Sequence, residues 1–100
     1  MKYTQLTYDY KYDVIADAIF AREMEYFHYE FDKTNFEHLL KALPEGEYRT
    51  NVEQRLADTI KQMAHVDAIY AALMAQVDDQ DAYAAAVERA KVRREKEKQE

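Results

Sequence analysis

The apolar residues of the chain recur every three, four or seven positions over most of its length, the spacing of one face of an α-helix. In the second half this pattern predicts a helix from about 51 to 77. Thr50 and Glu53 have the spacing of a capping box, in which both side chains satisfy backbone N–H groups at a helix start. The apolar face of this helix comprises Val52, Leu56, Met63, Val66, Tyr70, Leu73 and Val77.

Another long helix is predicted from about 14 to 43. Asp13 is its expected N-cap residue, because a carboxylate can accept hydrogen bonds from the free N–H groups of the first turn. Pro44 and Gly46 end it, since proline cannot continue a helix and glycine permits a tight turn. Thr34 begins another capping-box pattern inside this segment, so the helix either continues there or kinks and restarts.

The two ends of the chain have different patterns. Asp78 and Asp79 offer a cap for a third, shorter helix from about 80 to 97, whose apolar face is narrow. The first twelve residues alternate weakly between polar and apolar positions. This pattern predicts an N-terminal arm that is extended, docked on the helices or ordered only by a partner, or else a frayed terminus.

The expected fold is therefore all-α, with two long antiparallel helices and a shorter third helix that folds back on the pair or extends away. In terms of domains, we expect an arm (1–12), a single helical domain (13–97) and a frayed tail (98–100).

The first helix has more apolar surface than one packing partner needs. At 100° per residue, one broad face carries Ile15, Ile19, Tyr26, Tyr29, Phe36, Leu40 and Leu43. A second stripe on another side of the helix carries Phe20, Met24, Phe27 and Phe31. The third helix, the arm, a second copy of the chain or a foreign protein must cover this stripe. If none of the intramolecular elements does, Phe20, Phe27 and Phe31 are the expected binding anchors.

Charge adds a second candidate surface. The chain has 20 acidic and 14 basic residues, a net charge of −6, and Glu23, Glu30 and Glu37 share one helix face at intervals of seven. Residues 1–81 carry 16 acids and 8 bases, a net charge of −8, to which Asp78, Asp79 and Asp81 contribute. The row of glutamates at 23, 30 and 37 is either a solvated face or a surface that is attracted to a basic partner. The expected partner is a protein or nucleoprotein with a basic surface, and neither a nucleic acid alone nor a membrane.

Composition excludes most catalytic chemistry. The chain has no Cys, no Ser and one Gly, so it lacks the usual nucleophiles and the glycine-rich loops that bind phosphates. We therefore expect no enzyme activity, no catalytic residues and no cofactor. The apolar runs fall short of the roughly 20 residues that span a bilayer, and the N-terminus lacks the apolar region of a signal peptide, which predicts a cytoplasmic location.

One metal-binding alternative remains. Glu25 and His28 lie three residues apart on one helix face, the spacing that ferritin-like di-iron proteins use twice. Dimerisation could double the pair, and Glu37 or His38 could add ligands, giving a metal-binding oxidase. The pattern occurs once here, so no metal site is assigned. His65 lies opposite the apolar face of its helix, where we expect it to be exposed to solvent.

Three segments carry a family resemblance: DVIADAIFAREMEYFHYEFDKTNFEHLL, LPEGEYR and VDAIYAALMAQVDDQDAYAAAVERAKVRREKEK. Together they resemble small helical accessory proteins of bacteriophages and prophages of proteobacteria, among which anti-CRISPR proteins fit best. The resemblance implies an inhibitor that occupies a basic, nucleic-acid-binding surface of a CRISPR effector complex. A structural or assembly helper for phage particles is the other phage-related hypothesis.

Overall fold

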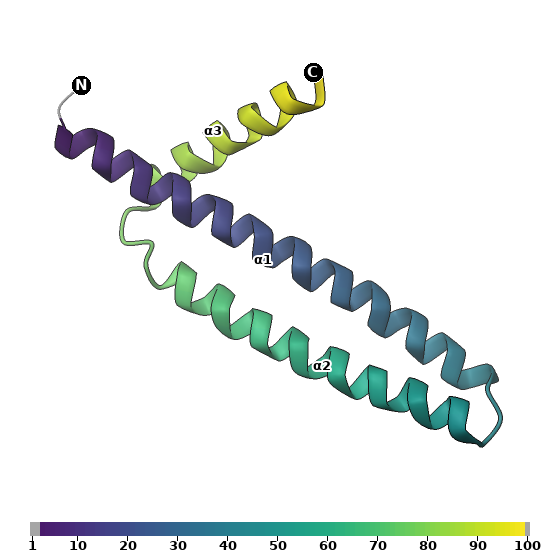
Figure 1. Cartoon of the computed structure of the whole chain (residues 1–100). Helices are drawn as coiled ribbons and strands as arrows, with labels where there is room; N and C mark the ends of the chain where they lie inside the picture. Colours follow the sequence, from purple (N-terminus) through teal and green to yellow (C-terminus); the bar gives the residue numbers. More distant parts are fainter. Residues whose placement is uncertain (1–2, 100) are drawn as a thin grey trace. The chain divides into compact units, whose positions relative to one another are not determined.

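The computed structural model describes residues 3–99, with side chains from Tyr8 onward, and contains three helices. They are α1 (Tyr3–Ala42), α2 (Glu47–Met74) and α3 (Gln80–Gln99), so the predicted all-α class with two long helices and a shorter third is confirmed (Figure 1). Two compact parts of the chain can be described separately. We call residues 22–70 the hairpin unit, and residues 3–21 together with 71–99 the terminal unit.

The predicted extended arm is wrong for residues 3–12, which form the first turns of α1. The reason is packing. Tyr12 is fully buried and continues the buried face of Ile15 and Ile19 at helical spacing, and Tyr8, which is 42% exposed, lies one turn before it. The rings of Tyr8 and Tyr12 meet edge to face, with centroids 5.1 Å apart. The first two residues of the predicted arm lie outside the described residues.

The predicted N-cap at Asp13 is also wrong, because α1 is already helical well before it. Asp13 instead forms ion pairs with α3, at 2.8 Å from Arg89 and 3.9 Å from Arg93. Of the two alternatives at Thr34, the structure has the continuous helix. The hydroxyl of Thr34 donates to the carbonyl of Glu30 at 3.0 Å, a bond made within a helix rather than at its start.

The turn between α1 and α2 lies at the predicted Pro44–Gly46 segment, but α2 begins earlier than expected. Gly46 occupies the N-cap position, because its carbonyl accepts the first helical bond, from the N–H of Thr50 at 3.1 Å. The Thr50 hydroxyl donates to the same carbonyl at 3.1 Å, so Thr50 lies in the first turn and is not the cap. Gly46 has φ of 149°, a conformation that other residues rarely adopt.

Arg49 ties this turn together. One terminal nitrogen of its guanidinium (Nη1) donates to the carbonyls of Leu40 at 2.7 Å and Leu43 at 2.8 Å, and Nε donates to Glu53 at 3.1 Å. The last carbonyls of a helix have no helical partner, so Arg49 supplies hydrogen bonds that the end of α1 needs.

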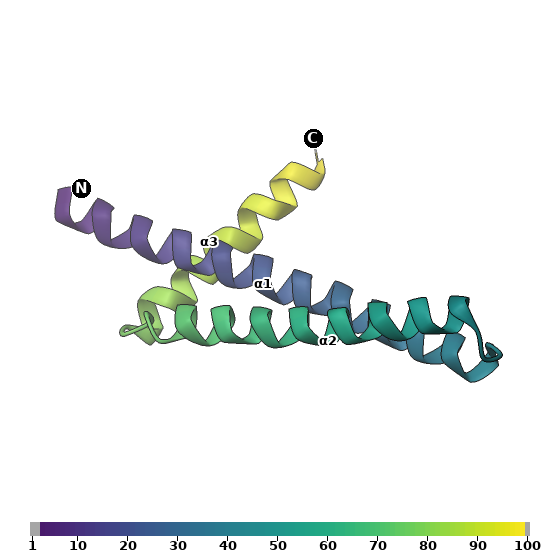
Figure 2. The same cartoon turned by 60° about the horizontal axis from the view of Figure 1, so that its bottom comes forward.

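Within the hairpin unit, α1 and α2 run antiparallel and side by side in both views (Figures 1 and 2). The predicted faces meet here: Val52 and Val66 of α2 are buried, and Tyr26, Phe36 and Leu40 of α1 are partly buried. The sequence analysis missed Thr59, which is buried between the two valines at a spacing of seven residues from each.

Within the terminal unit, α3 packs against the first part of α1. Asp79 caps α3 as predicted, because its carboxylate accepts a hydrogen bond from the N–H of Ala82 at 3.0 Å. Ala86 and Ala90 form the buried face of α3, and their small side chains permit a close approach to α1. Contacts with α1 reach as far along α3 as Arg94. The helix continues to Gln99, beyond the predicted end at 97, so residues 98 and 99 of the predicted frayed tail are helical, and residue 100 lies outside the described residues.

Candidate protein-binding surface

The nine residues predicted to contact a partner separate into two groups in the structure. Glu23, Phe27, Glu30, Phe31 and Glu37 belong to the hairpin unit, and Phe20, Asp78, Asp79 and Asp81 belong to the terminal unit. Most side chains of the second group already have partners within the chain, whereas most of the first group do not.

Two of the aspartates have structural contacts. The hydroxyl of Tyr12 donates to Asp78, and the hydroxyl of Tyr8 donates to Asp79. These hydrogen bonds lower the pKa of both carboxyl groups below the usual 3.8 and raise the pKa of both tyrosines above the usual 10.0. The pairs fix the start of α3 against the start of α1, which is a role in folding. Asp81, in the first turn of α3, is exposed.

The second apolar stripe of α1 is covered at one end. The guanidinium carbon of Arg94 on α3 lies 3.8 Å from the ring centre of Phe20, a cation–π contact. Of the coverings considered from the sequence, the third helix therefore covers Phe20. Farther along the stripe, Met24 is 43% exposed, Phe27 65% and Phe31 62%, so the part of the stripe in the hairpin unit is open.

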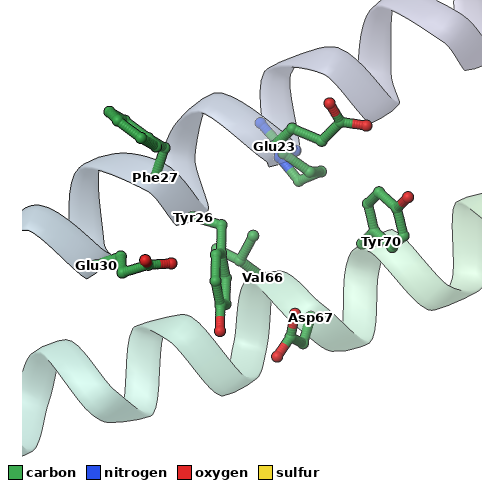
Figure 3. A pocket seen from close by; sticks show the side chains of 8 residues that line it. Glu23, Tyr26, Phe27, Glu30, Val66, Asp67 and Tyr70 are labelled. Atoms are coloured by element: carbon green, nitrogen blue, oxygen red, sulfur yellow. The ribbon is translucent and has the colours of Figure 1, made fainter.

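A groove of about 310 Å³ lies beside this open part of the stripe, between α1 and α2 (Figure 3). We call it the α1–α2 groove. Its lining is mainly aromatic and acidic, and its side chains come from both helices: Arg22, Glu23, Tyr26, Phe27, Glu30, Val66, Asp67 and Tyr70.

The close-up shows how these side chains are arranged. Tyr26 extends from α1 toward α2, and Tyr70 rises from α2 toward α1, so the two rings stand at separate places along the groove (Figure 3). The ring of Phe27 points away from α2 and forms the outer edge, while the side chain of Glu30 extends toward Tyr26. The groove thus has an aromatic interior with carboxylates around it.

The carboxylates of the groove have no counterions. Within the described part of the chain, the carboxylates of Glu23, Glu30 and Asp67 form no ion pair and accept no hydrogen bond. Arg22, the one basic residue of the lining, is paired with Glu25 at 2.8 Å. The groove therefore presents uncompensated negative charge beside exposed aromatic surface.

A smaller hollow continues the groove along α1. It has a volume of about 190 Å³ and is lined by Phe27, Glu30, Phe31 and Thr34. Phe27 and Glu30 line both hollows, so the surface follows one stripe of α1 from Glu23 to Thr34, a length of about 16 Å. Glu37 lies just beyond it and is within 3.8 Å of Lys33, so part of its charge is compensated.

A third hollow provides a contrast. It has a volume of about 510 Å³, lies near the turn of the hairpin unit, and includes Phe36, Tyr48 and Arg55 in its lining. No carboxylate lines it, so the largest of the three hollows lacks the charge that distinguishes the α1–α2 groove.

In the described part of the chain, the residues of the metal-binding alternative do not come together as a set of metal ligands. Glu25 is held by Arg22, and His28, His38 and His65 are exposed, the last as predicted. Among the residues that the structure describes, no three His, Asp or Glu side chains are placed to hold a metal ion.

Sequence reasoning found the α1 side of the groove and missed the α2 side. Tyr26 and Val66 were assigned to the core, and Asp67 and Tyr70 were not considered as site residues. Counting outward from the turn at Pro44–Gly46 would have placed the part of α2 around Val66 opposite Tyr26, because neighbouring antiparallel helices have equal rise per residue.

Comparison with models of known protein families, with curated proteins and with solved structures finds no match for this chain. No helix within residues 3–99 is long and apolar enough to span a membrane.

Proposed function

We propose that this chain is a non-enzymatic binding protein that occupies a basic surface of a protein or nucleoprotein partner, with the α1–α2 groove as its contact surface. The observation that carries the proposal is the juxtaposition of an exposed aromatic ring, Phe27, with the uncompensated carboxylates of Glu23 and Glu30. Aromatic residues are enriched in protein interfaces, where they supply contact area at a low cost in side-chain entropy.

Charge supports the choice of a basic partner. The hairpin unit carries ten acidic and six basic residues, a net charge of −4. Complementary potentials raise the association rate and select against partners of the same sign. The groove adds apolar surface at the centre of this field, which is the arrangement of an interface with an anchoring core and a charged rim.

The most concrete version of the proposal is an anti-CRISPR inhibitor, and it rests on the resemblance to small helical phage accessory proteins. In this version the basic surface is the nucleic-acid-binding surface of a CRISPR effector complex, and carboxylates at intervals of seven along α1 take the place of phosphates. The anti-CRISPR version is tested by measuring, in a gel-shift experiment, how well purified effector complexes bind their target DNA. We expect loss of DNA binding once the protein equals the effector in concentration. Undiminished DNA binding at a large excess, for each complex tested, contradicts this version and leaves the broader proposal standing.

The broader proposal is tested with two double variants that change the net charge equally. Glu23→Lys with Glu30→Lys reverses the charge of the groove. Asp32→Lys with Asp58→Lys reverses two exposed carboxylates that line none of the three hollows described above. Tagged protein is used to capture partners from a bacterial host lysate, and the bound proteins are quantified. We expect the groove variant to lose a basic partner that the parent and the control variant both retain.

Circular dichroism of both variants provides the folding control, because all four positions are exposed and the helices should persist. Equal capture of the partner by the two double variants contradicts the proposal, because the carboxylates of the groove then contribute no more to binding than two carboxylates outside it.

A further inference from the structure

We propose that the α1–α2 groove recognises arginine, so that the contact segment of the partner places a guanidinium group against Phe27 and between the carboxylates of Glu23 and Glu30. This inference rests on the proposed function and specifies the chemistry of the partner. Two observations support it. Arginines of α3 bind a carboxylate and an aromatic ring of α1 within the chain, and the groove presents a carboxylate and an aromatic ring at a similar spacing.

The contact within the chain lies in the terminal unit. The guanidinium of Arg94 stacks on Phe20, and the neighbouring Arg93 donates to both carboxylate oxygens of Asp17, at 3.1 and 3.4 Å. Asp17 and Phe20 are three residues apart on α1 and therefore lie on one face. A carboxylate and an aromatic ring one turn apart on α1 thus bind two adjacent arginines of α3.

The groove presents the same two groups farther along α1. Glu23 precedes Phe27 by four residues and Glu30 follows it by three, so both residues lie one turn from Phe27 on the same face of α1. Phe27 is 65% exposed, against 37% for Phe20 beneath its arginine. Within the described residues no cation lies over the ring of Phe27, so the groove has the binding groups and no guanidinium.

The lining favours arginine over lysine. A guanidinium is planar and weakly hydrated, so it can stack on a ring while its edge donates to carboxylates, whereas an ammonium is compact and strongly hydrated. The methylene groups of the arginine would contact the ring of Tyr26, which is only partly buried. A volume of about 310 Å³ is at the small end of ligand pockets, suited to one or two side chains.

The charge around the groove also suits a cation. Four acidic residues and one basic residue, Arg22, lie at or beside the groove, which gives a local net charge of −3. The acidic residues are Glu23, Glu25, Glu30 and Asp67. Arg22 is oriented by its ion pair with Glu25. An arriving guanidinium therefore meets three carboxylates that no residue of the described chain neutralises.

The test uses three fluorescein-labelled peptides of the form Ala-Ala-X-X-Ala-Ala, with X as arginine, lysine or citrulline, and measures binding to the full chain by fluorescence anisotropy at low salt. Citrulline has the shape of arginine without its charge. We expect the arginine peptide to bind more tightly than the lysine peptide and the citrulline peptide to bind most weakly. Phe27→Ala should weaken the arginine peptide about 2- to 30-fold, and Glu23→Gln with Glu30→Gln by a similar factor.

Tyr48→Ala is the matched control, because Tyr48 is 64% exposed and lines only the hollow without carboxylates. It should leave the affinity unchanged. Equal binding of the arginine and lysine peptides, with no effect of Phe27→Ala, overturns the inference while leaving an electrostatic surface and hence the proposed function. Absence of arginine-peptide binding at millimolar concentration also overturns it. A dimer of the parent chain in sedimentation velocity that becomes a monomer in Phe27→Ala also overturns the inference. The groove is then filled by a second copy of the chain.

Discussion

The hydrogen bonds of Arg49 make a quantitative prediction about the hairpin unit. Replacing Arg49 by Met keeps an unbranched apolar stem and removes every donor, so the carbonyls of Leu40 and Leu43 lose their partner and Glu53 loses its ion pair. Because the substituted side chain lies in the first turn of α2, where Met is a good helix former, the change tests the contacts more than the helix propensity.

The magnitude follows from the geometry. A hydrogen bond to a charged donor contributes about 1.5 to 3 kcal/mol. The side chain of Arg49 is 27% exposed, so water can replace part of each bond, and the low end of the range applies. Two bonds at that value give a loss of about 3 kcal/mol in the free energy of unfolding. For a domain of this size, this corresponds to a fall in Tm of about 12 to 24 °C.

Thermal and urea unfolding followed by circular dichroism at the helix band measure this loss. Arg49→Lys keeps a positive charge near the end of α1 and should lose less stability than Arg49→Met. Glu53→Ala removes only the exposed ion pair and should cost less than about 1 kcal/mol. The reasoning is refuted if Arg49→Met is as stable as the parent, or if Glu53→Ala costs as much as Arg49→Met, since the carbonyl bonds then contribute nothing.

Three further predictions concern the rest of the fold. Ile19→Ala removes a side chain that is 1% exposed and should lower the free energy of unfolding by about 2 to 5 kcal/mol in urea titrations, with Phe20 more exposed to a quencher if the terminal unit opens. Because hydrogen bonds from the tyrosines lower the pKa of Asp78 and Asp79, their contribution is present above pH 3.8 and is lost as pH falls through the folded-state pKa. The urea midpoint should therefore drop on acidification below that pH, and less steeply in the doubly amidated variant Asp78→Asn with Asp79→Asn. Gly46→Ala should cost about 1 to 3 kcal/mol because of its φ of 149°, although nothing lies within 4 Å of the added methyl group.

Helical periodicity and chain breakers predict most of this fold, because they depend on near neighbours in the sequence. The turn at Pro44–Gly46 and the cap at Asp79 are local features, and both are found where the sequence places them. The residues before Val14 were misassigned because their weak alternation was given more weight than the helical spacing of Tyr8, Tyr12 and Ile15. The contacts that decide between these two patterns are hydrogen bonds to Asp78 and Asp79, which lie just before α3 and more than sixty residues later in the sequence.

Capping boxes were the less reliable local signal. The hydroxyls of Thr34 and Thr50 each donate to the carbonyl four residues earlier, which is the alternative to capping that a threonine has inside a helix. For the candidate site, the sequence identifies the exposed stripe of α1, whereas Asp67 and Tyr70 join it only through the alignment of α2 against α1. That alignment follows from counting residues outward from the turn at Pro44–Gly46 and not from the apolar pattern of either helix alone.

The division of the chain has a consequence for the order in which it folds. The hairpin unit is one continuous stretch, whereas the terminal unit is assembled from two stretches that lie on either side of it in the sequence. The helix pair of the hairpin unit therefore needs no residue beyond 70, whereas the terminal unit brings together residues more than seventy positions apart, such as Asp13 with Arg89 and Asp17 with Arg93. Contacts between distant residues form more slowly, because a longer loop must close first. The hairpin unit is therefore expected to form first, and its closure does not wait for α3.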